Sequence, residues 1–156
     1  MKIYTVDFEK VIGSYKNYVV KMLELDQLKM KHHTEMDVFR KEMENLINSS
    51  RSGLIIDENL QKQNLQRFKD LQVEASKKDN EFRTMLSEKQ NSIMEVSFQE
   101  VSSIIEDYCN QVQIDWVLSK SQVVFCKSQF EITDMIIERF KSKDLYYENV
   151  LGEKEN

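Results

Sequence analysis

The sequence has 156 residues, a net charge of −5, no proline and only three glycines. That length corresponds to one domain, and the near absence of helix-breaking residues favours long, uninterrupted helices. The acidic balance argues against a nucleic-acid binder, because phosphate contacts need a basic surface, and no stretch is apolar enough for membrane insertion.

The N-terminal segment alternates apolar and polar side chains. Tyr4, Val6 and Phe8 fall on one side of residues 2–8, which predicts a half-buried strand. A short helix is expected over residues 9–15, weakened by a glycine.

The middle of the chain predicts a helical hairpin. From about residue 19 to residue 47, apolar side chains recur at spacings of three and four, with His32 filling one gap in the stripe. A second and longer helical pattern runs over residues 54–112. Between the two lies a cluster of turn residues that predicts the tip of the hairpin, with a glycine free to adopt a left-handed conformation. The tip residues are Asn48, Ser49, Ser50, Arg51, Ser52 and Gly53.

The last part of the chain changes to short β-type runs. Ile114–Ser119 and Gln122–Cys126 are rich in β-branched and aromatic residues, and the short connection between them predicts a β-hairpin. A final helix is expected from about Phe130 to Lys141. Because an isolated hairpin is marginally stable, we expect it to pair with residues 2–8 in a three-stranded sheet. A small sheet with open edges is also a reason to oligomerise.

These elements predict an α+β fold that is mostly α. It has a small three-stranded β body and a long antiparallel coiled-coil hairpin, here called the arm. We assign residues 1–18 and 100–145 to the body, 19–99 to the arm and 146–156 to a polar tail.

The order of these elements resembles the Skp/OmpH family of trimeric chaperones. The resemblance is most specific near the C-terminus, where the family pattern is matched by "IDWVL" at 114–118, "VVF" at 123–125 and "EIT" at 131–133. The opening "KIYTVDFEKVI" also looks like the family's first strand and the helix after it. The resemblance covers nearly the whole chain, although the arm matches only in pattern.

The resemblance implies an ATP-independent holdase, a chaperone that binds unfolded clients without refolding them. It implies a homotrimer whose strands form a barrel-like trimerisation body and whose arms enclose a client cavity. Clients of this family are typically outer-membrane β-barrels in the periplasm. The residues expected in the trimer body are Tyr4, Val6, Phe8, Ile114, Trp116, Leu118, Val123 and Phe125.

Methionines on the arm are candidate client contacts, because their side chains adapt to varied partners. These candidates are Met30, Met36, Met43, Met85 and Met94. The alternative is that most of them fill the seam, the line along which the two arm helices meet. Met30 and Met94 lie off the main apolar stripes and are the strongest candidates.

Two alternatives concern role and compartment. A structural coiled-coil assembly protein of a phage or cell envelope would show the same pattern and bind no clients. The N-terminus does not read as a signal peptide, which predicts a cytoplasmic or phage-encoded protein as written. A periplasmic protein is expected if a signal has been removed.

No residue pattern predicts catalysis, a metal or a cofactor. His32 and His33 point about 100° apart on a helix, which favours one seam histidine and one solvated histidine over a metal site. Cys109 and Cys126 are expected to be buried free thiols. Three isolated glycines cannot form a phosphate-binding loop, so we expect no enzyme.

Overall fold

The computed structural model describes residues 1–53 and 57–149, which form two compact units. Unit 1 contains residues 1–23 and 91–149, and unit 2 contains residues 24–90. Two long helices, α2 (Lys16–Arg51) and α3 (Glu58–Val112), contribute to both units. Among the described helices, none is long and apolar enough to cross a membrane.

Unit 1 begins with the predicted strand and short helix. These are β1 (Ile3–Val6) and α1 (Phe8–Ser14), and the side chain of Asp7 caps α1 by accepting a hydrogen bond from the backbone N–H of Lys10. After α3 come the strand β2, two single 3₁₀ turns and the last helix. Their bounds are β2 Trp116–Ser119, η1 Lys120–Gln122, η2 Ser128–Phe130 and α4 Thr133–Ser142.

The sheet of unit 1 has two strands in the described residues, and they are parallel. In its register Ile3 lies opposite Trp116 and Val6 opposite Ser119. A parallel pair needs a long connection, which the two long helices supply here. The predicted pairing of residues 2–8 with the segment after the long helix is confirmed, but the described residues contain no third strand of the sheet.

The predicted β-hairpin is wrong because its second run, Gln122–Cys126, is not a strand. The chain instead turns through η1, and the backbone N–H of Val123 donates to the carbonyl of Lys120. The free edge of β1 is taken up at Thr5, whose carbonyl accepts from the backbone N–H of Ile132 in an isolated bridge. Because the chain turns through η1 directly after β2, this run does not return along the open edge of β2.

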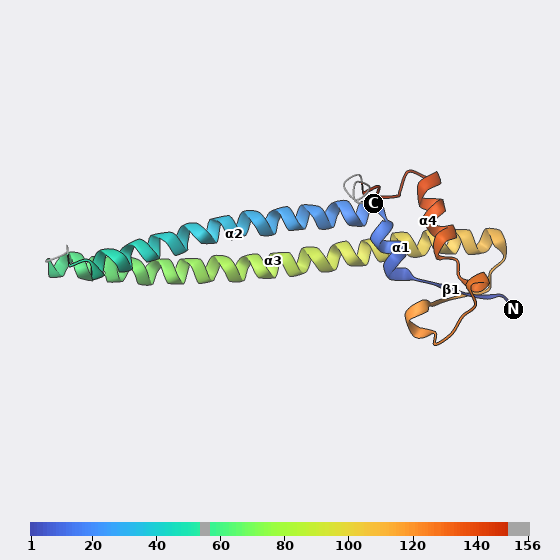
Figure 1. The fold of residues 1–156 in the computed structure, drawn as a ribbon, viewed down its shortest axis with the longest axis horizontal. Coiled ribbons are helices and arrows are strands. Elements are labelled where there is room, and N and C mark those ends of the chain that lie inside the picture. Colours follow the sequence, from blue (N-terminus) through green and yellow to red (C-terminus); the bar gives the residue numbers. More distant parts are fainter. Residues whose placement is uncertain (54–56, 150–156) are drawn as a thin grey trace, which may run out of the picture. The chain divides into compact units, whose positions relative to one another are not determined.

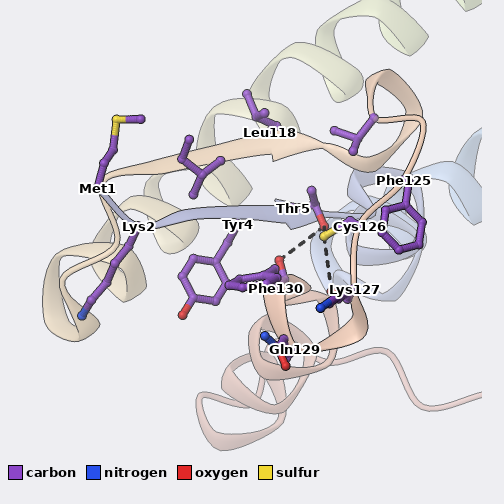
Figure 2. A pocket seen from close by; sticks show the side chains of 12 residues that line it. Met1, Lys2, Tyr4, Thr5, Leu118, Phe125, Cys126, Lys127, Gln129 and Phe130 are labelled. Carbon is purple, nitrogen blue, oxygen red and sulfur yellow. Dashed lines mark hydrogen bonds between the residues drawn. The ribbon is translucent and has the colours of Figure 1, made fainter.

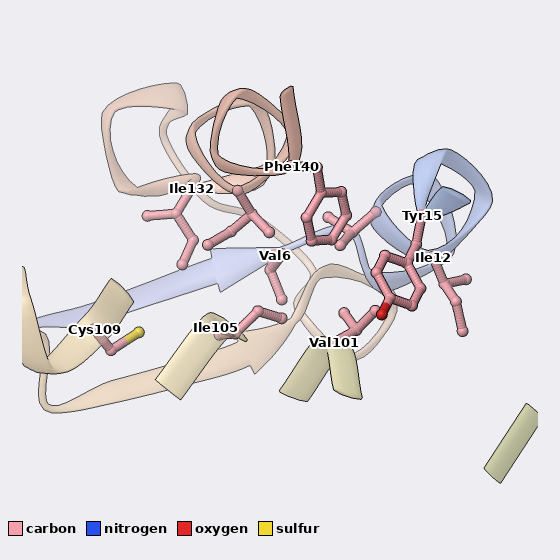
Figure 3. Packing of buried hydrophobic residues seen from close by; sticks show 10 residues of the cluster. Val6, Ile12, Tyr15, Val101, Ile105, Cys109, Ile132 and Phe140 are labelled. Carbon is pink, nitrogen blue, oxygen red and sulfur yellow. The ribbon is translucent and has the colours of Figure 1, made fainter. Parts of the chain in front are cut away.

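The core of unit 1 is built from one face of α3 and the elements that cover it. Val101, Ile105 and Cys109 recur every four residues on α3 and are buried. Against them pack side chains from β1, α1 and α4, including Phe140, which lies beside Tyr15 in Figure 3 with ring centroids 5.3 Å apart. The remaining buried members of this cluster are Val6, Val11, Ile12, Ile132 and Ile136.

Helix α3 ends in a residue with a left-handed backbone. Gln113 has φ 57°, and the N–H of Ile114 then donates to the carbonyl of Cys109 at 2.9 Å, as in a Schellman cap. Left-handed backbone is costly for a residue with a Cβ atom and nearly free for glycine.

Replacing Gln113 with glycine should therefore stabilise the protein. We expect Gln113→Gly to raise the free energy of unfolding by about 1 kcal/mol, measured by urea denaturation. The matched control is Asn110→Gly one turn earlier, where the backbone is helical. It should lower stability by about 0.3 kcal/mol, the difference in helix propensity between asparagine and glycine. Destabilisation by Gln113→Gly would contradict this interpretation of the cap.

Unit 2 is the predicted helical hairpin. Figure 1 shows α2 and α3 side by side in this part of the chain. Leu25, Leu71 and Ala75 are the buried hydrophobic residues of its described part, and most other seam residues are half-buried. Polar contacts also join the helices: both Nε and one terminal nitrogen of Arg67 donate to Glu42 Oε1, and Lys78 Nζ lies 5.2 Å from the centre of the Phe39 ring.

The tip of the hairpin begins later than predicted, because α2 continues through Arg51. The hydroxyls of Ser49 and Ser50 donate to the carbonyls four residues earlier, at 2.8 and 3.0 Å. In this way serines that favour turns can instead remain in a helix. Gly53 has the predicted left-handed backbone, with φ 67°. The predicted start of the second helix at residue 54 lies outside the described residues.

Candidate oligomerisation and client-binding surfaces

Unit 1 carries an open groove beside the sheet, which we call the β groove. Figure 2 shows β1 and the chain after β2 forming its sides, with Tyr4 and Phe130 close together. Its volume is about 630 Å³. The groove is lined by Met1, Lys2, Ile3, Tyr4, Thr5, Leu118, Val123, Phe125, Cys126, Lys127, Gln129 and Phe130.

The outer face of the sheet is apolar and exposed. Side chains alternate along β2, so Trp116 and Leu118 face solvent while Val117 packs against the core. Trp116 keeps 60% of its surface exposed, and its register neighbour on β1, Ile3, is also exposed. A contiguous apolar face of this kind marks an interaction site more often than a solvated surface.

The chain after β2 adds more apolar surface. Phe125 is 78% exposed and Val124 is fully exposed. This run is held in place by contacts at its two ends rather than by a strand ladder. Lys120 Nζ donates to both oxygens of Glu131, which raises the pKa of the lysine, and Thr5 Oγ1 lies 3.4 Å from Cys126 Sγ. Its β-forming side chains thus have little to pack against in one chain.

The residues predicted for the trimer body differ in how far they are buried in the single chain. Val6 lies in the chain's own core, and Phe8 packs on the exposed Phe98 with ring centroids 4.9 Å apart. Tyr4, Ile114 and Val123 are half-buried, and Trp116, Leu118 and Phe125 are exposed. The exposed group is the part available to another chain, and its role stays a prediction.

Further apolar residues of this surface, among them Ile3 and Phe130, were not in the predicted set. Strand alternation predicts Ile3 on the side opposite Tyr4, and the helical pattern predicts that Phe130 begins the last helix. Phe130 instead belongs to η2, where its ring meets Tyr4 edge-on at 5.9 Å. The large apolar side chains of Ile3 and Phe130 were the available signal in the sequence. The direction in which each side chain points depends on turns that the sequence pattern does not predict.

The candidate client-binding methionines are also placed differently from one another. Met36, Met43 and Met85 are half-buried along the helices, which is compatible with a seam position. Met30 is 72% exposed on unit 2, and Met94 is 44% exposed but belongs to unit 1. Among the five candidate methionines, Met30 is therefore the one that is exposed on unit 2.

His32 and His33 occupy the two environments predicted for them. His33 is exposed, whereas the His32 ring stacks on Phe82 with centroids 3.9 Å apart. His32 Nε2 lies 3.0 Å from Asp79 Oδ1, and Arg83 Nε donates to the other oxygen of Asp79 at 2.7 Å. These hydrogen bonds, first from His32 and then from Arg83, lower the pKa of Asp79.

The lowered pKa of Asp79 predicts an acid-sensitive hairpin. The carboxylate of Asp79 should contribute its full stabilisation of the folded state above its unfolded pKa of about 3.9. That stabilisation should be lost as the pH falls through the lower pKa that Asp79 has in the folded protein. We expect the melting temperature to fall as the pH drops below about 4, and Asp79→Asn to remove part of that fall. Far-ultraviolet circular dichroism would measure both.

The control for this pH series is Glu88→Gln, which neutralises an exposed carboxylate on the same helix. It should leave the pH dependence unchanged. Equal pH profiles for Asp79→Asn and the unaltered chain would show that the His32–Asp79–Arg83 contacts contribute nothing to stability.

The described residues do not assemble a group of three or more His, Cys, Asp or Glu side chains suited to a metal ion. Both cysteines are free thiols. Cys109 is buried as predicted, and burial raises its thiol pKa, which makes it a poor nucleophile at neutral pH. Cys126 is only half-buried and lines the β groove, so the expectation of burial holds for one thiol of the two.

A long helical hairpin joined to a small strand-and-helix unit defines the class of fold. The family model described as outer membrane protein (OmpH-like) matches residues 2–140, and the chain belongs to this family. Among solved structures, the fold is similar to that of an OmpH-like protein from Caulobacter crescentus CB15, described as a candidate outer membrane chaperone. The TM-score is 0.77 at 12% identity, over 90% of this chain and 84% of that one. No curated protein matches the chain.

Proposed function

We propose that the chain is an ATP-independent holdase that acts as a homotrimer and holds unfolded proteins between its helical arms. The observation that carries this proposal is the apolar surface that unit 1 leaves exposed around Trp116, Leu118 and Phe125. Membership of the OmpH-like family and the fold shared with a candidate outer membrane chaperone support it.

Trimerisation would account for the incomplete sheet of unit 1. In the described residues β2 is paired on one edge only, and the run after it is unpaired along most of its length. Exposed strand edges of this kind invite pairing with another chain. A cyclic trimer would repeat each contact around its axis and leave no open end.

The surface of unit 2 suits weak and repeated contacts with clients. Its described part exposes single large apolar side chains spread along both helices, and these are Met30, Val38, Ile47, Leu60, Leu65 and Val73. Charges of both signs lie among them, including the pairs Arg40–Asp37 and Arg83–Asp79. Such a mixed surface would not attract acidic clients over long range, so client binding would depend on apolar contact.

The proposal is tested by aggregation of a denatured outer-membrane β-barrel protein diluted from urea. Without nucleotide, we expect light scattering to fall in proportion to added protein and to vanish near one trimer per client. Trp116→Glu, designed to be monomeric, serves as the matched control and should suppress far less. A stable trimer that suppresses nothing would contradict the holdase and favour the structural assembly protein.

A further inference from the structure

The segment after α4 turns back sharply onto the beginning of the chain. Asp144 has a left-handed backbone with φ 55°, Leu145 N donates to the carbonyl of Phe140 at 2.8 Å, and Asp144 N donates to that of Lys141 at 3.3 Å. These two bonds are those of a Schellman cap. The cap ends α4 on its own, before the chain reaches any other element.

Residues 144–147, which we call the strap, then bind the joint between α1 and α2. Leu145 accepts a hydrogen bond on its carbonyl from the N–H of Lys16 at 2.8 Å, and the N–H of Tyr147 donates to the carbonyl of Ser14 at 2.9 Å. Between these bonds, Tyr15 and Tyr146 lie opposite one another in an antiparallel bridge.

The strap binds two backbone groups, the carbonyl of Ser14 and the N–H of Lys16, that have no hydrogen-bond partner within their own helices. Ser14 is the last residue of α1 and Lys16 the first of α2, so the carbonyl of one and the N–H of the other have no partner within their helices. Tyr15 between them is extended, with φ −76° and ψ 114°, and is buried. The strap thus completes the backbone hydrogen bonding of the joint.

The Tyr15 side chain fixes the joint independently of the strap. Its hydroxyl donates to Glu100 Oε2 on α3 at 2.7 Å, and its ring packs on Phe140 of α4. Burial and then the bond to Glu100 raise its pKa to about 12. The joint would therefore keep its place in the core if the strap came away, although its backbone groups would lose their partners.

The strap itself is lightly held. The side chains of Leu145, Tyr146 and Tyr147 are only half-buried, and the first two contact the edge of the core cluster without entering it. A hollow of about 400 Å³ lies between the strap and the start of α2. The ion pair of Lys16 with Asp144 spans 3.7 Å between exposed side chains, and such pairs contribute little. Lys141 Nζ lies 4.9 Å from the centre of the Tyr146 ring, a weak exposed cation–π contact.

We propose that the strap is a latch on the α1–α2 joint: when closed it orders the first turn of α2, and it opens as a unit while the core stays folded. Few buried contacts and a small number of backbone bonds are the features of segments that open locally. The independent cap at the end of α4 lets the strap detach without unwinding that helix. The latch does not depend on the proposed function.

The test removes one strap bond at a position that tolerates proline. Lys16 is the first residue of α2 and follows an extended residue, so proline fits the backbone at this position. The substitution deletes the N–H that donates a hydrogen bond to the carbonyl of Leu145. In the full chain, Lys16→Pro should speed amide hydrogen exchange at Tyr147 at least about 10-fold. Lys16→Ala keeps the N–H, loses the ion pair and should leave Tyr147 protected.

The reciprocal variant is Tyr147→Pro, which removes the other strap bond outside both helices. It should speed exchange of the Lys16 amide by a similar factor, whereas Glu148→Ala should not. In every variant the amides of Ile136 and Phe140 should keep their protection, which shows that the core is folded. The latch is overturned if Tyr147 is unprotected in the unaltered chain, or if either proline leaves the opposite bond protected.

Discussion

Trp116→Glu is expected to convert the proposed trimer into folded monomers of 18.6 kDa. Trp116 is 60% exposed in the single chain, so a polar replacement removes little from the chain's own core. In a trimer the same side chain would be buried, and burying a large apolar side chain contributes about 2 to 3 kcal/mol. A carboxylate in its place would add a desolvation cost of several kcal/mol. In a symmetric trimer the same loss of binding free energy would occur at each of the subunit interfaces.

Light scattering coupled to size-exclusion chromatography would measure this change, with circular dichroism to confirm that the helices persist. Leu118→Glu, on the same face of β2, should act in the same way. The control is Ser52→Glu at the hairpin tip, which introduces the same charge and should leave the trimer intact. A trimer that survives both Trp116→Glu and Leu118→Glu would place the interface elsewhere.

Phe140→Ala is expected to give the largest loss of folding stability. Phe140 is 0% exposed and touches Tyr15, so it links α4 to the α1–α2 joint. Removing a buried phenylalanine side chain leaves a cavity and costs about 3 to 5 kcal/mol. Much of the stability of a small unit is of this size, so the variant should melt far below the unaltered protein.

Urea denaturation would measure that loss, followed by circular dichroism at low protein concentration. Met135→Ala lies on the same helix but is exposed, and it should cost less than about 1 kcal/mol. Both substitutions end in alanine on the same helix, so the main difference between them is the burial of the side chain that is removed. Similar costs for the two substitutions would mean that Phe140 does not lie in the core of unit 1.

The order of the elements could be predicted because it depends on local patterns. Stripes with a spacing of three and four residues located α2 and α3, and alternation located β1. The similarity of residues 114–118 to the family pattern correctly placed a strand at β2. Each of these signals is contained within one element and needs no knowledge of its neighbours.

The pairing of residues 2–8 with the segment after α3 was predicted and is confirmed by β1 and β2, but the direction of that pairing and the course of the run after β2 could not be predicted. The run Gln122–Cys126 has the composition of a strand, but whether it forms one depends on the turn before it, and η1 does not return the chain along β2. The parallel direction of β2 follows from the path through the long helices. Composition alone favoured the hairpin because its two runs are adjacent in sequence.

The strap and the tip show a second limit of sequence patterns. The strap is held by backbone groups of Ser14 and Lys16, which every residue type except proline could supply, so no side-chain signal marks it. At the tip, Ser49 and Ser50 are turn-forming residues whose hydroxyls bond back to the helix instead. In both cases hydrogen bonds, rather than residue preferences, decided the structure.

The most direct test of the proposed trimeric holdase is native mass measurement of the protein with an unfolded outer-membrane β-barrel client. Without nucleotide, we predict a particle whose mass is three times the 18.6 kDa chain plus one client. The same particle should not form with Trp116→Glu. A monomer with or without client, or a trimer that never acquires client mass, would contradict the proposal.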